Sequence, residues 1–416
     1  MARIATIDDL DLDGTRVLLR VDINSPIDPD TGRIADETRI DKSLPTIRDL
    51  ADGGARVTII AHQGDTLDYH NLVGLEEHAE KLAAKLGRPV CYTDDVAGPA
   101  ARAAIAALEP GEILLLDNLR FLTEEVSTFE SAVKLTPAEM TQTYLVRNLA
   151  PLFDVYVNDA FAAAHRGAPS MVAFQQLMPY AGGRLLTAEL DALEAVAGNP
   201  ARPCLFVLGG LKISDAFSML QQVLTEGIAD EVLTTGITGQ VMLLAAGHSL
   251  GEGSEQFIAD RSLDVFIPAA REYLRAFPGK IHMPVDVAVE RGGQRVEIDV
   301  EDLPVAEPIV DIGSDTMAVY EERIAAAATI FVNGPAGVYE RENSAEGTRR
   351  LWAAVADAPG TSVIGGGDTV SSAGRFIDPA RIDFVSTGGG ALIRYLSGQP
   401  LPLLEAMSDP GPTDGS

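Results

Sequence analysis

Short apolar runs recur along the chain, and each ends at a turn that precedes a helical pattern. The runs are four to six residues long and rich in β-branched side chains, which is typical of buried strands. They fall at residues 16–21, 56–61, 113–117, 155–158, 204–208, 231–234, 329–333 and 361–364. Between them, segments such as 71–86 and 348–356 carry apolar residues at helical spacing. Strands that alternate with helices predict an α/β fold with parallel sheets covered on both faces.

Length and punctuation predict two domains. The 416 residues suit two doubly wound, Rossmann-like parallel-sheet domains of roughly 200 residues each. The segment 182–200 opens on two glycines, continues as a helical pattern and ends at Asn199-Pro200, so we expect a helical hinge there. We expect an N-terminal domain at 1–181, a C-terminal domain at 201–391, and a segment from about 392 to 416 that packs back on the first domain.

Charge and composition narrow the possible partners. The chain carries 61 acidic and 32 basic residues, and its net charge of −29 repels nucleic acid and anionic lipid at long range. The sequence contains no run approaching 18 apolar residues and no apolar secretion signal, so we expect a soluble, cytoplasmic protein without membrane partners. Its two cysteines are too few for a disulfide framework. An anionic substrate would therefore need a local cluster of basic residues.

Polar residues cluster after the apolar runs of the first half. They include Arg39, Arg120 and Arg166, together with His62 and His165. The planar guanidinium group makes bidentate bonds to carboxylate or phosphate, so three arginines near strand ends could form a pocket for a small phosphorylated anion. The alternative for any single arginine is an ordinary surface ion pair. The histidines do not have the spacing of zinc ligands.

Glycine-rich turns follow the apolar runs of the second half. Lys212 follows Gly209-Gly210, Asp368 follows the glycines at 365–367, and a further glycine triplet stands at 388–390. Backbone N–H groups at such turns bind phosphate, Asp368 could hold Mg²⁺, and Lys212 could contact a transferring phosphate. One glycine turn would be weak evidence, because strand-to-helix turns often need positive φ without a ligand. Several in one domain favour a phosphate site.

Residue patterns alone thus indicate a hinge-closing phosphotransferase without naming its substrate. The P-loop pattern GxxxxGK[ST] is missing, and no GxGxxG follows the first strand of either half. A nicotinamide dehydrogenase would share the fold class but lacks this fingerprint. A non-catalytic binding protein would be indicated by loss of Arg39 or Lys212, and both residues are present.

The ordered motifs resemble the phosphoglycerate kinase family. The matching blocks are RVDINSP, TRI, AHQG, DNLRF, YVNDAFAAAHR, LGGLKISD, PVDVAVE, VNGPAGVYE, IGGGDT and STGGG. They stand in family order over nearly the whole chain, and the HQG form of the substrate loop looks like the archaeal branch. The resemblance implies reversible, Mg²⁺-dependent phosphoryl transfer between ATP and 3-phosphoglycerate in glycolysis and gluconeogenesis, by direct in-line transfer with hinge closure. We expect the active form to be a monomer.

The resemblance also implies roles for individual residues. In the N-terminal domain, 3-phosphoglycerate would be held by Asp22, Ile23, Asn24, Arg39, His62, Gln63, Gly64, Arg120 and Arg166. In the C-terminal domain, the nucleotide would be held by Gly210, Lys212, Asn333, Pro335, Glu340, Gly366, Gly367, Asp368 and Thr369. Glu340 would contact the ribose and Asp368 the Mg²⁺ ion. The transferring phosphoryl group would be stabilised by Arg39, Lys212 and the backbone amides at Gly366 and Gly389.

Two positions depart from the family pattern. The family often has Arg after HxG, where this chain has Asp65, and many relatives carry Lys four residues after Lys212, where this chain has Ala216. Asp65 raises the alternative of a kinase that acts on another phosphorylated carboxylate. We expect instead that a rebuilt loop at 66–71 points Asp65 away from the pocket. Replacing Asp65 would then change KM for 3-phosphoglycerate by less than about threefold, since three arginines remain.

A substrate carboxylate is already ionised at neutral pH, because its reference pKa lies near 4. The reaction therefore needs no general base. Catalysis would come from in-line positioning and neutralisation of charge.

Overall fold

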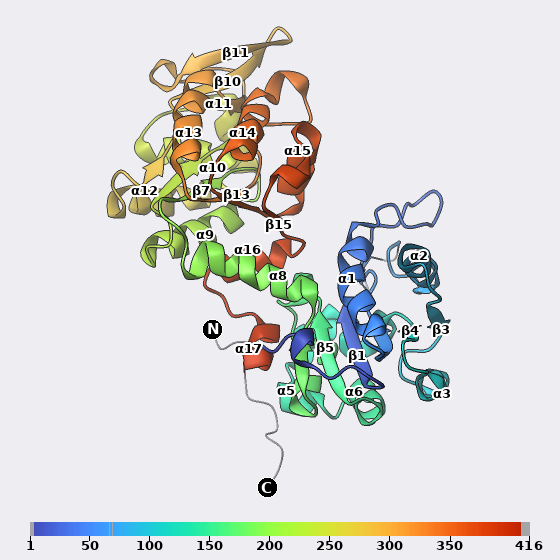
Figure 1. Cartoon of the computed structure of the whole chain (residues 1–416). Coiled ribbons are helices and arrows are strands. Elements are labelled where there is room, and N and C mark those ends of the chain that lie inside the picture. The colour runs from blue at the N-terminus through green and yellow to red at the C-terminus, as the bar shows by residue number, and fades with distance from the viewer. Residues whose placement is uncertain (1–3, 66, 69, 409–416) are drawn as a thin grey trace. The chain divides into compact units, whose positions relative to one another are not determined.

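The computed structural model describes residues 4–65, 67–68 and 70–408 and divides into two compact units (Figure 1). Unit 1 falls within Met1–Leu190 and Pro400–Ser416, and unit 2 is Asp191–Gln399. The division lies inside the segment 182–200, which was expected to connect two domains, and the segment that returns to unit 1 begins at Pro400.

Unit 1 is built on a six-stranded parallel sheet of order β3-β4-β2-β1-β5-β6. Its strands are β1 (Arg16–Val21), β2 (Arg56–Ile60), β3 (Cys91–Thr93), β4 (Ile113–Leu116), β5 (Val155–Asp159) and β6 (Tyr180–Gly182). After β1 the chain adds strands on one side of it, and β5 then continues the sheet on the other side. The carboxyl ends of β1 and β5 therefore flank a topological switch point, where ligands bind in open α/β sheets.

Helices cover both faces of this sheet, and α1 and α2 pack side by side (Figure 1). The helices are η1 (Ile7–Asp9), α1 (Thr38–Asp52), α2 (Glu76–Leu86), α3 (Pro99–Ala107), η2 (Leu119–Phe121), η3 (Thr123–Glu125), α4 (Ser127–Val133), α5 (Pro137–Met140), α6 (Tyr144–Leu149), η4 (Ala150–Leu152), η5 (Phe161–Ala163), α7 (Pro169–Val172), η6 (Phe174–Gln176), α8 (Arg184–Leu193) and α17 (Pro402–Ser408). The last of these returns to unit 1, where the Leu403 amide donates to the Ala164 carbonyl at 3.2 Å.

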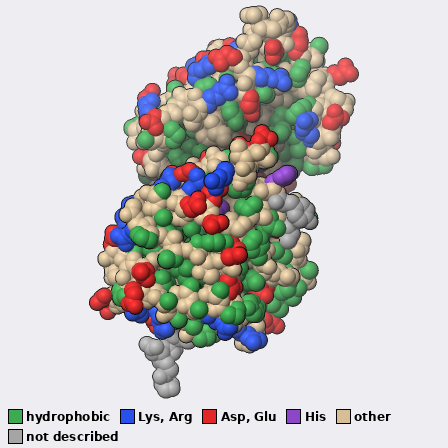
Figure 2. Space-filling model, turned by 90° about the vertical axis from the view of Figure 1, so that its right-hand side faces the viewer, with side chains coloured by type: hydrophobic (Ala, Val, Ile, Leu, Met, Phe, Trp, Pro, Cys, Tyr) green, Lys and Arg blue, Asp and Glu red, His purple; other side chains and the backbone are tan. Residues whose placement is uncertain are grey.

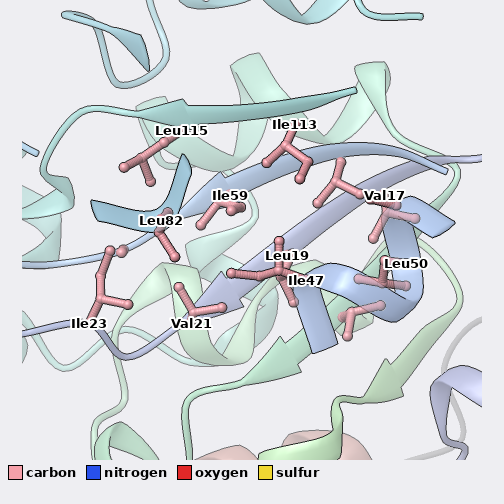
Figure 3. Close-up of a cluster of buried hydrophobic side chains, with 14 of the residues drawn as sticks. Val17, Leu19, Val21, Ile23, Ile47, Leu50, Ile59, Leu82, Ile113 and Leu115 are labelled. Atoms are coloured by element: carbon pink, nitrogen blue, oxygen red, sulfur yellow. The ribbon is translucent and has the colours of Figure 1, made fainter. Parts of the chain in front are cut away.

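The core of unit 1 lies between β1 and its covering helices (Figure 3). Alternate residues of a strand point to one face, so Val17, Leu19 and Val21 line the same side of the sheet. Ile47 and Leu50 of α1 pack against that side, and all five side chains are fully buried. Burial of this apolar surface, at roughly 25 cal/mol per Å², holds the strand ends in place.

Unit 2 repeats the architecture with a six-stranded parallel sheet of order β15-β14-β13-β7-β8-β9. Its strands are β7 (Cys204–Leu208), β8 (Glu231–Thr234), β9 (Ile281–His282), β13 (Thr329–Asn333), β14 (Thr361–Ile364) and β15 (Phe384–Val385). The chain reverses direction across the sheet between β7 and β13, which places the second switch point there. The predicted class, two doubly wound parallel-sheet domains, is confirmed.

The helices of unit 2 cover its sheet in the same way. They are η7 (Glu194–Gly198), α9 (Ile213–Thr225), α10 (Gly236–Ala246), α11 (Glu252–Asp260), η8 (Asp264–Phe266), α12 (Ile267–Ala276), η9 (Val300–Asp302), α13 (Ser314–Ala326), η10 (Glu342–Ser344), α14 (Glu346–Asp357), α15 (Gly367–Phe376), η11 (Pro379–Arg381) and α16 (Gly389–Leu396). Across the described ranges, every helix is too short or too polar to span a bilayer. Figure 2 shows acidic and basic side chains interspersed on the displayed surface.

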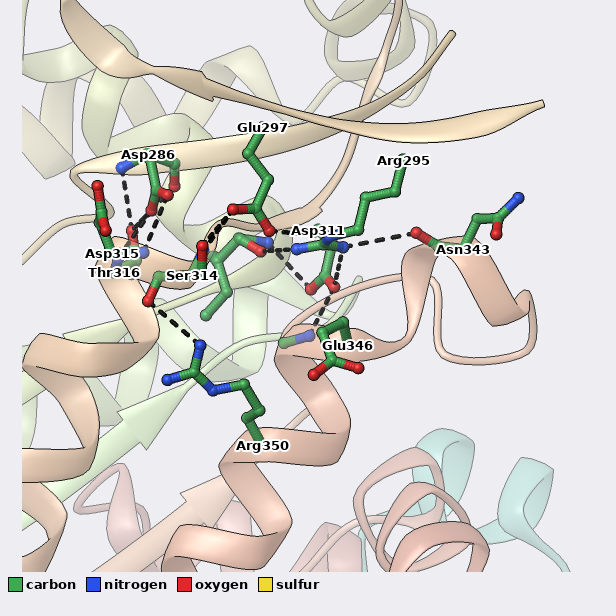
Figure 4. A network of polar contacts seen from close by, with 12 residues as sticks. Asp286, Arg295, Glu297, Asp311, Ser314, Asp315, Thr316, Asn343, Glu346 and Arg350 are labelled. Atoms are coloured by element: carbon green, nitrogen blue, oxygen red, sulfur yellow. Dashed lines mark hydrogen bonds and ion pairs between the residues drawn. The ribbon is translucent and has the colours of Figure 1, made fainter. Parts of the chain in front are cut away.

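Unit 2 also contains a three-stranded antiparallel sheet that the sequence analysis missed. Its order is β11-β10-β12, with β10 (Asp286–Arg291), β11 (Gln294–Asp299) and β12 (Ile309–Ile312). The hairpin turns at Gly292-Gly293, both of which have positive φ. Arg295 of β11 binds Asp311 of β12 at 2.8 Å, and Asp311 also accepts the Gly347 amide at 2.7 Å (Figure 4). Burial raises the pKa of Asp311 to about 6 even with this arginine beside it.

Candidate active site

The three predicted anion-binding arginines lie at the carboxyl edge of the unit 1 sheet. We call Asp22, Arg39, His62, Asp65, Arg120, Glu130 and Arg166 the arginine site. Asp22 directly follows β1, His62 follows β2, and Arg120 lies in η2 just after β4. Arg39 stands in the first turn of α1, and Arg166 follows β5 and η5.

His62 is surrounded by charged groups of the arginine site. It is buried, and its Nδ1 lies 3.0 Å from Nη2 of Arg20. Arginine can only donate, so Nδ1 accepts and the imidazole proton sits on Nε2. Burial first, and then the positive charges of Arg20, Arg120 and Arg39, hold the pKa of His62 well below its usual range. The ring is therefore neutral.

Arg39 is paired with Asp22. Its Nη1 donates to Oδ2 of Asp22 at 2.6 Å, and the Asn24 amide donates to the other carboxylate oxygen at 3.1 Å. Burial by itself raises the pKa of Asp22, but Arg39 and the neighbouring positive charges outweigh it, so the net shift is downward. This pair holds the first turn of α1 over the end of β1.

Arg120 is paired with Asp65, which corrects the expectation that Asp65 points away from the pocket. Oδ2 of Asp65 lies 2.5 Å from Nη1 of Arg120, whose side chain is only 7% exposed. Asp65 also accepts the Ser127 hydroxyl. The sequence could not show this contact, because Ser127 comes from a distant segment of the chain. Thr66 and Tyr69, within the loop expected to turn Asp65 outward, lie outside the described residues.

Arg166 is paired with Glu130, at 2.6 Å between Nε and Oε2, and the Gly167 amide donates to the same carboxylate at 2.6 Å. Nη2 of Arg166 is buried without a hydrogen-bond partner among the described residues. Burial is the main cause that lowers the pKa of Arg120, and the positive charge of Arg166 lowers it further. These two guanidinium groups therefore repel one another, which favours an anion near both.

The remaining predicted residues hold the loop that follows β2. Gln63 is fully buried, accepts from the Ser25 amide at 2.8 Å and donates to the Asn71 carbonyl at 3.0 Å. The Gly64 amide donates to Asn24 Oδ1 at 3.0 Å, and a Cβ on Gly64 would lie 2.4 Å from the Asn71 backbone. Ile23 belongs to the hydrophobic core. Their assignment to substrate binding stays a prediction.

Sequence reasoning missed a buried charge beneath the arginine site. Arg20 is 2% exposed and donates to Ser170 Oγ at 3.3 Å. Ser170 in turn donates from its hydroxyl and its amide to Glu125, at 2.6 and 2.7 Å. The available signal was an arginine inside the otherwise apolar strand RVLLRV.

In unit 2, the predicted glycine turns meet at the switch point between β7 and β13. Gly209 and Gly210 donate to the carbonyls of Asn333 and Pro335, at 2.9 and 2.8 Å. A Cβ on Gly334 would lie 2.3 Å from the Gly209 carbonyl oxygen, so the two turns leave no room for side chains. Gly210 and Gly334 both have positive φ.

The helix N-termini of α15 and α16 are also adjacent. A Cβ on Gly389, the first residue of α16, would lie 3.3 Å from Cα of Gly366, which caps α15. Lys212 Nζ lies 3.8 Å from Asp368 Oδ2, and both side chains are mostly exposed. Gly366, Gly389, Lys212 and Asp368 form what we call the glycine site. Thr369 supports it by accepting the Gly334 amide at 2.8 Å.

A cavity of about 620 Å³ lies beside the glycine site within unit 2. Its lining includes the predicted residues Gly210, Pro335, Glu340 and Asp368. Sequence reasoning missed its apolar wall, which comes from α10 and α11. The signal was a further glycine after a strand, Gly236 with positive φ at the start of α10. The volume lies in the range of small-molecule sites.

An arginine site and a phosphate-compatible glycine site, each at the switch point of a parallel sheet, are features of a phosphotransferase of the two-domain α/β class. Comparison with known proteins agrees with this class. The phosphoglycerate kinase family model matches residues 7–399. The chain therefore belongs to the phosphoglycerate kinase family.

Individual relatives match over nearly their whole length. The chain is 43% identical to the phosphoglycerate kinase of Methanothermobacter thermautotrophicus over 98% of this chain and 97% of that one. It is 43% identical to that of Halobacterium salinarum, over 97% and 99%. The crystal structure of phosphoglycerate kinase from Pyrococcus horikoshii matches with a TM-score of 0.86 and 38% identity, over 97% and 98% of the two chains.

Asp159, at the end of β5, predicts a pH effect on stability. Its carboxylate is buried and accepts the Leu186 amide at 2.9 Å, and burial raises its pKa to about 7. Between pH 4 and 7 the unfolded chain ionises this group while the folded chain keeps it protonated, so its contribution to stability falls as pH rises. The stability of Asp159→Asn relative to wild type should therefore increase by up to about 4 kcal/mol over this range.

The measurement is the free energy of unfolding by denaturant at several pH values. Asp154→Asn is the matched control, because Asp154 pairs with Arg16 at 2.6 Å and its pKa is lowered, chiefly by that hydrogen bond. Between pH 4 and 7 its relative stability should stay nearly level, because a lowered pKa keeps this carboxylate ionised in both the folded and the unfolded chain; it should fall with rising pH only below about pH 4. Parallel pH profiles for the two variants would contradict the raised pKa of Asp159.

Proposed function

We propose that the chain transfers a phosphoryl group reversibly between ATP and the carboxylate of 3-phosphoglycerate, giving ADP and 1,3-bisphosphoglycerate. The observation that carries this proposal is the grouping of Lys212, Asp368 and two adjacent helix N-termini in unit 2. A phosphorylated acid is the acceptor that the arginine site of unit 1 suits best. Family membership supports the same reaction and a place in glycolysis and gluconeogenesis, and we propose a cytoplasmic location.

The nucleotide would occupy the cavity of unit 2, with Glu340 at the ribose and the phosphates at the N-terminus of α15. Asp368 fits a Mg²⁺ ion bound with that nucleotide. Mg²⁺ commonly takes one or two carboxylates together with substrate phosphates and water. The described residues contain no cluster of three or more acidic, His or Cys side chains that would form an all-protein metal cage. When bound, the ion would neutralise charge on the phosphate oxygens.

The chain's own groups would do the rest by position and charge. The substrate carboxylate is ionised at neutral pH, and the neutral, buried His62 is not needed as a base. Arg39 and Lys212 would neutralise charge that develops on the phosphoryl group, and the amides at Gly366 and Gly389 would donate to its oxygens. A second candidate, another phosphorylated carboxylic acid, is favoured by the carboxylate of Asp65 beside Arg120.

A coupled assay tests the proposed function. ATP, Mg²⁺ and 3-phosphoglycerate should support turnover, measured across a range of KCl concentrations because the chain carries a net charge of −29. Other phosphorylated acids are tested in parallel. Turnover with one of them and none with 3-phosphoglycerate would favour the second candidate.

Lys212→Ala should lower kcat far more than it raises KM for 3-phosphoglycerate. The reason is that Lys212 lies in unit 2, beside Asp368, where its charge would stabilise the phosphoryl group during transfer rather than bind the acid. We expect a loss of about 100-fold or more in kcat, the size found for one transition-state donor. Lys280→Ala, in the same unit after α12, is the matched control and should keep wild-type kcat. A normal kcat with only a raised KM would show that Lys212 has another role.

We propose that the active form is a monomer. Gel filtration at working salt should give a mass near 44.0 kDa. A mass near twice that value would contradict it.

A further inference from the structure

Asp65 is held against Arg120 by more than one contact. Its carboxylate lies 2.5 Å from Nη1 of Arg120 and also accepts the hydroxyl of Ser127. Arg120 is buried, and the same nitrogen donates to the Gly64 carbonyl at 3.3 Å. The carboxylate therefore occupies a donor nitrogen of Arg120 that would otherwise be available to an anion.

The short helix α4 contributes one residue to this contact and a second residue to the neighbouring arginine. Ser127 and Glu130 stand three residues apart, which places them on the same face of the helix. Ser127 holds Asp65, and Glu130 binds Arg166 at 2.6 Å. One helix thus supports two carboxylates against two arginines of the arginine site.

The charges around the arginine site consequently balance before any substrate binds. The positive groups are Arg20, Arg39, Arg120 and Arg166. The carboxylates in contact with them or with Ser170 are Asp22, Asp65, Glu125 and Glu130. His62 is neutral, so four positive and four negative groups cancel. An anion that binds Arg120 in this site has to share its guanidinium group with the carboxylate of Asp65.

The loop itself does not depend on Asp65. Gln63 binds the backbone of Ser25 and Asn71, and Asn24 binds the Gly64 amide. What depends on Asp65 is the buried guanidinium group of Arg120, whose charge it compensates. The side chain of Asp65 therefore acts on the charge of the site rather than on the fold of the loop.

We propose that Asp65 is a specificity-determining residue that competes with the phosphate of the acid substrate for Arg120. This inference rests on the proposed function and deepens it. The site then discriminates by charge, because Asp65 weakens binding of a phosphorylated acid and leaves an acid without phosphate nearly unaffected. The earlier expectation of a negligible effect assumed an outward orientation, which the Arg120 contact excludes.

The test is calorimetric binding of two acids with the same carbon skeleton, 3-phosphoglycerate and glycerate. Asp65→Asn removes the charge and keeps an oxygen that can accept from Ser127. It should tighten 3-phosphoglycerate binding about fivefold at low salt, the effect of one unit charge at contact range in a wet site. Glycerate binding should change by less than about twofold, and the gain for 3-phosphoglycerate should shrink near 1 M KCl, where the Debye length is about 3 Å.

Asp68→Asn is the matched control, because Asp68 is an exposed acid of the same loop that binds Asn71 at 2.8 Å. It changes the net charge equally and should leave both affinities within twofold of wild type. Asp65→Ala should also tighten the binding of 3-phosphoglycerate. Circular dichroism checks that each variant is folded.

An unchanged or weaker affinity of Asp65→Asn for 3-phosphoglycerate would overturn the proposal, as would an equal gain for glycerate. Turnover of the wild-type enzyme is recorded separately. Normal turnover with no gain in Asp65→Asn rejects the role of Asp65 and leaves the proposed function intact. A gain in binding without wild-type turnover rejects the proposed function and keeps the role of Asp65.

Discussion

A parallel sheet covered by helices on both faces can bury apolar side chains along its strands but must place polar groups where the strands end. In unit 1, Val17, Leu19 and Val21 are buried within β1, and Asp22 follows directly. In unit 2, β7 is buried along its whole length and is followed directly by Gly209. The chemistry of each unit therefore collects at one edge of its sheet, next to the switch point.

Arg20 is the exception that shows how strict this constraint is. A guanidinium group inside a covered sheet is tolerated only with a matching charge, and Ser170 links it to Glu125. Burial raises the pKa of Glu125, although its bonds to Ser170 and the charge of Arg20 oppose that rise. Removing either charged partner would leave the other without compensation in the interior. The same pairing of charges continues outward through the arginine site.

Much of the fold follows from local pattern. The strands β1, β7 and β13 coincide with their predicted ranges, because each is a short, largely apolar run followed by a turn. Edge strands of two or three residues, such as β9 and β15, are too short to carry a pattern. The antiparallel sheet of β10–β12 was missed although the glycine pair of its hairpin is visible in the sequence.

The candidate site was predictable by residue type and not by orientation. The glycine turns and arginines were recognised, since strand-end position and chemistry are local properties. The direction of Asp65 depends on Ser127 and Arg120, which come from other segments, so no local pattern contains it. Gly236 and the apolar wall of the cavity were likewise assembled only by packing.

The tight turns of unit 2 affect what the conservation of its glycines during evolution would mean. Side chains at Gly209 and Gly334 are excluded by neighbouring protein atoms, Thr235 and the Gly209 carbonyl, rather than by a ligand. A descendant that had lost catalysis would still have to keep these glycines in order to fold, whereas Lys212, with its exposed side chain, would be free to drift. Retention of these glycines would thus reflect the architecture of the unit and would not by itself indicate catalysis.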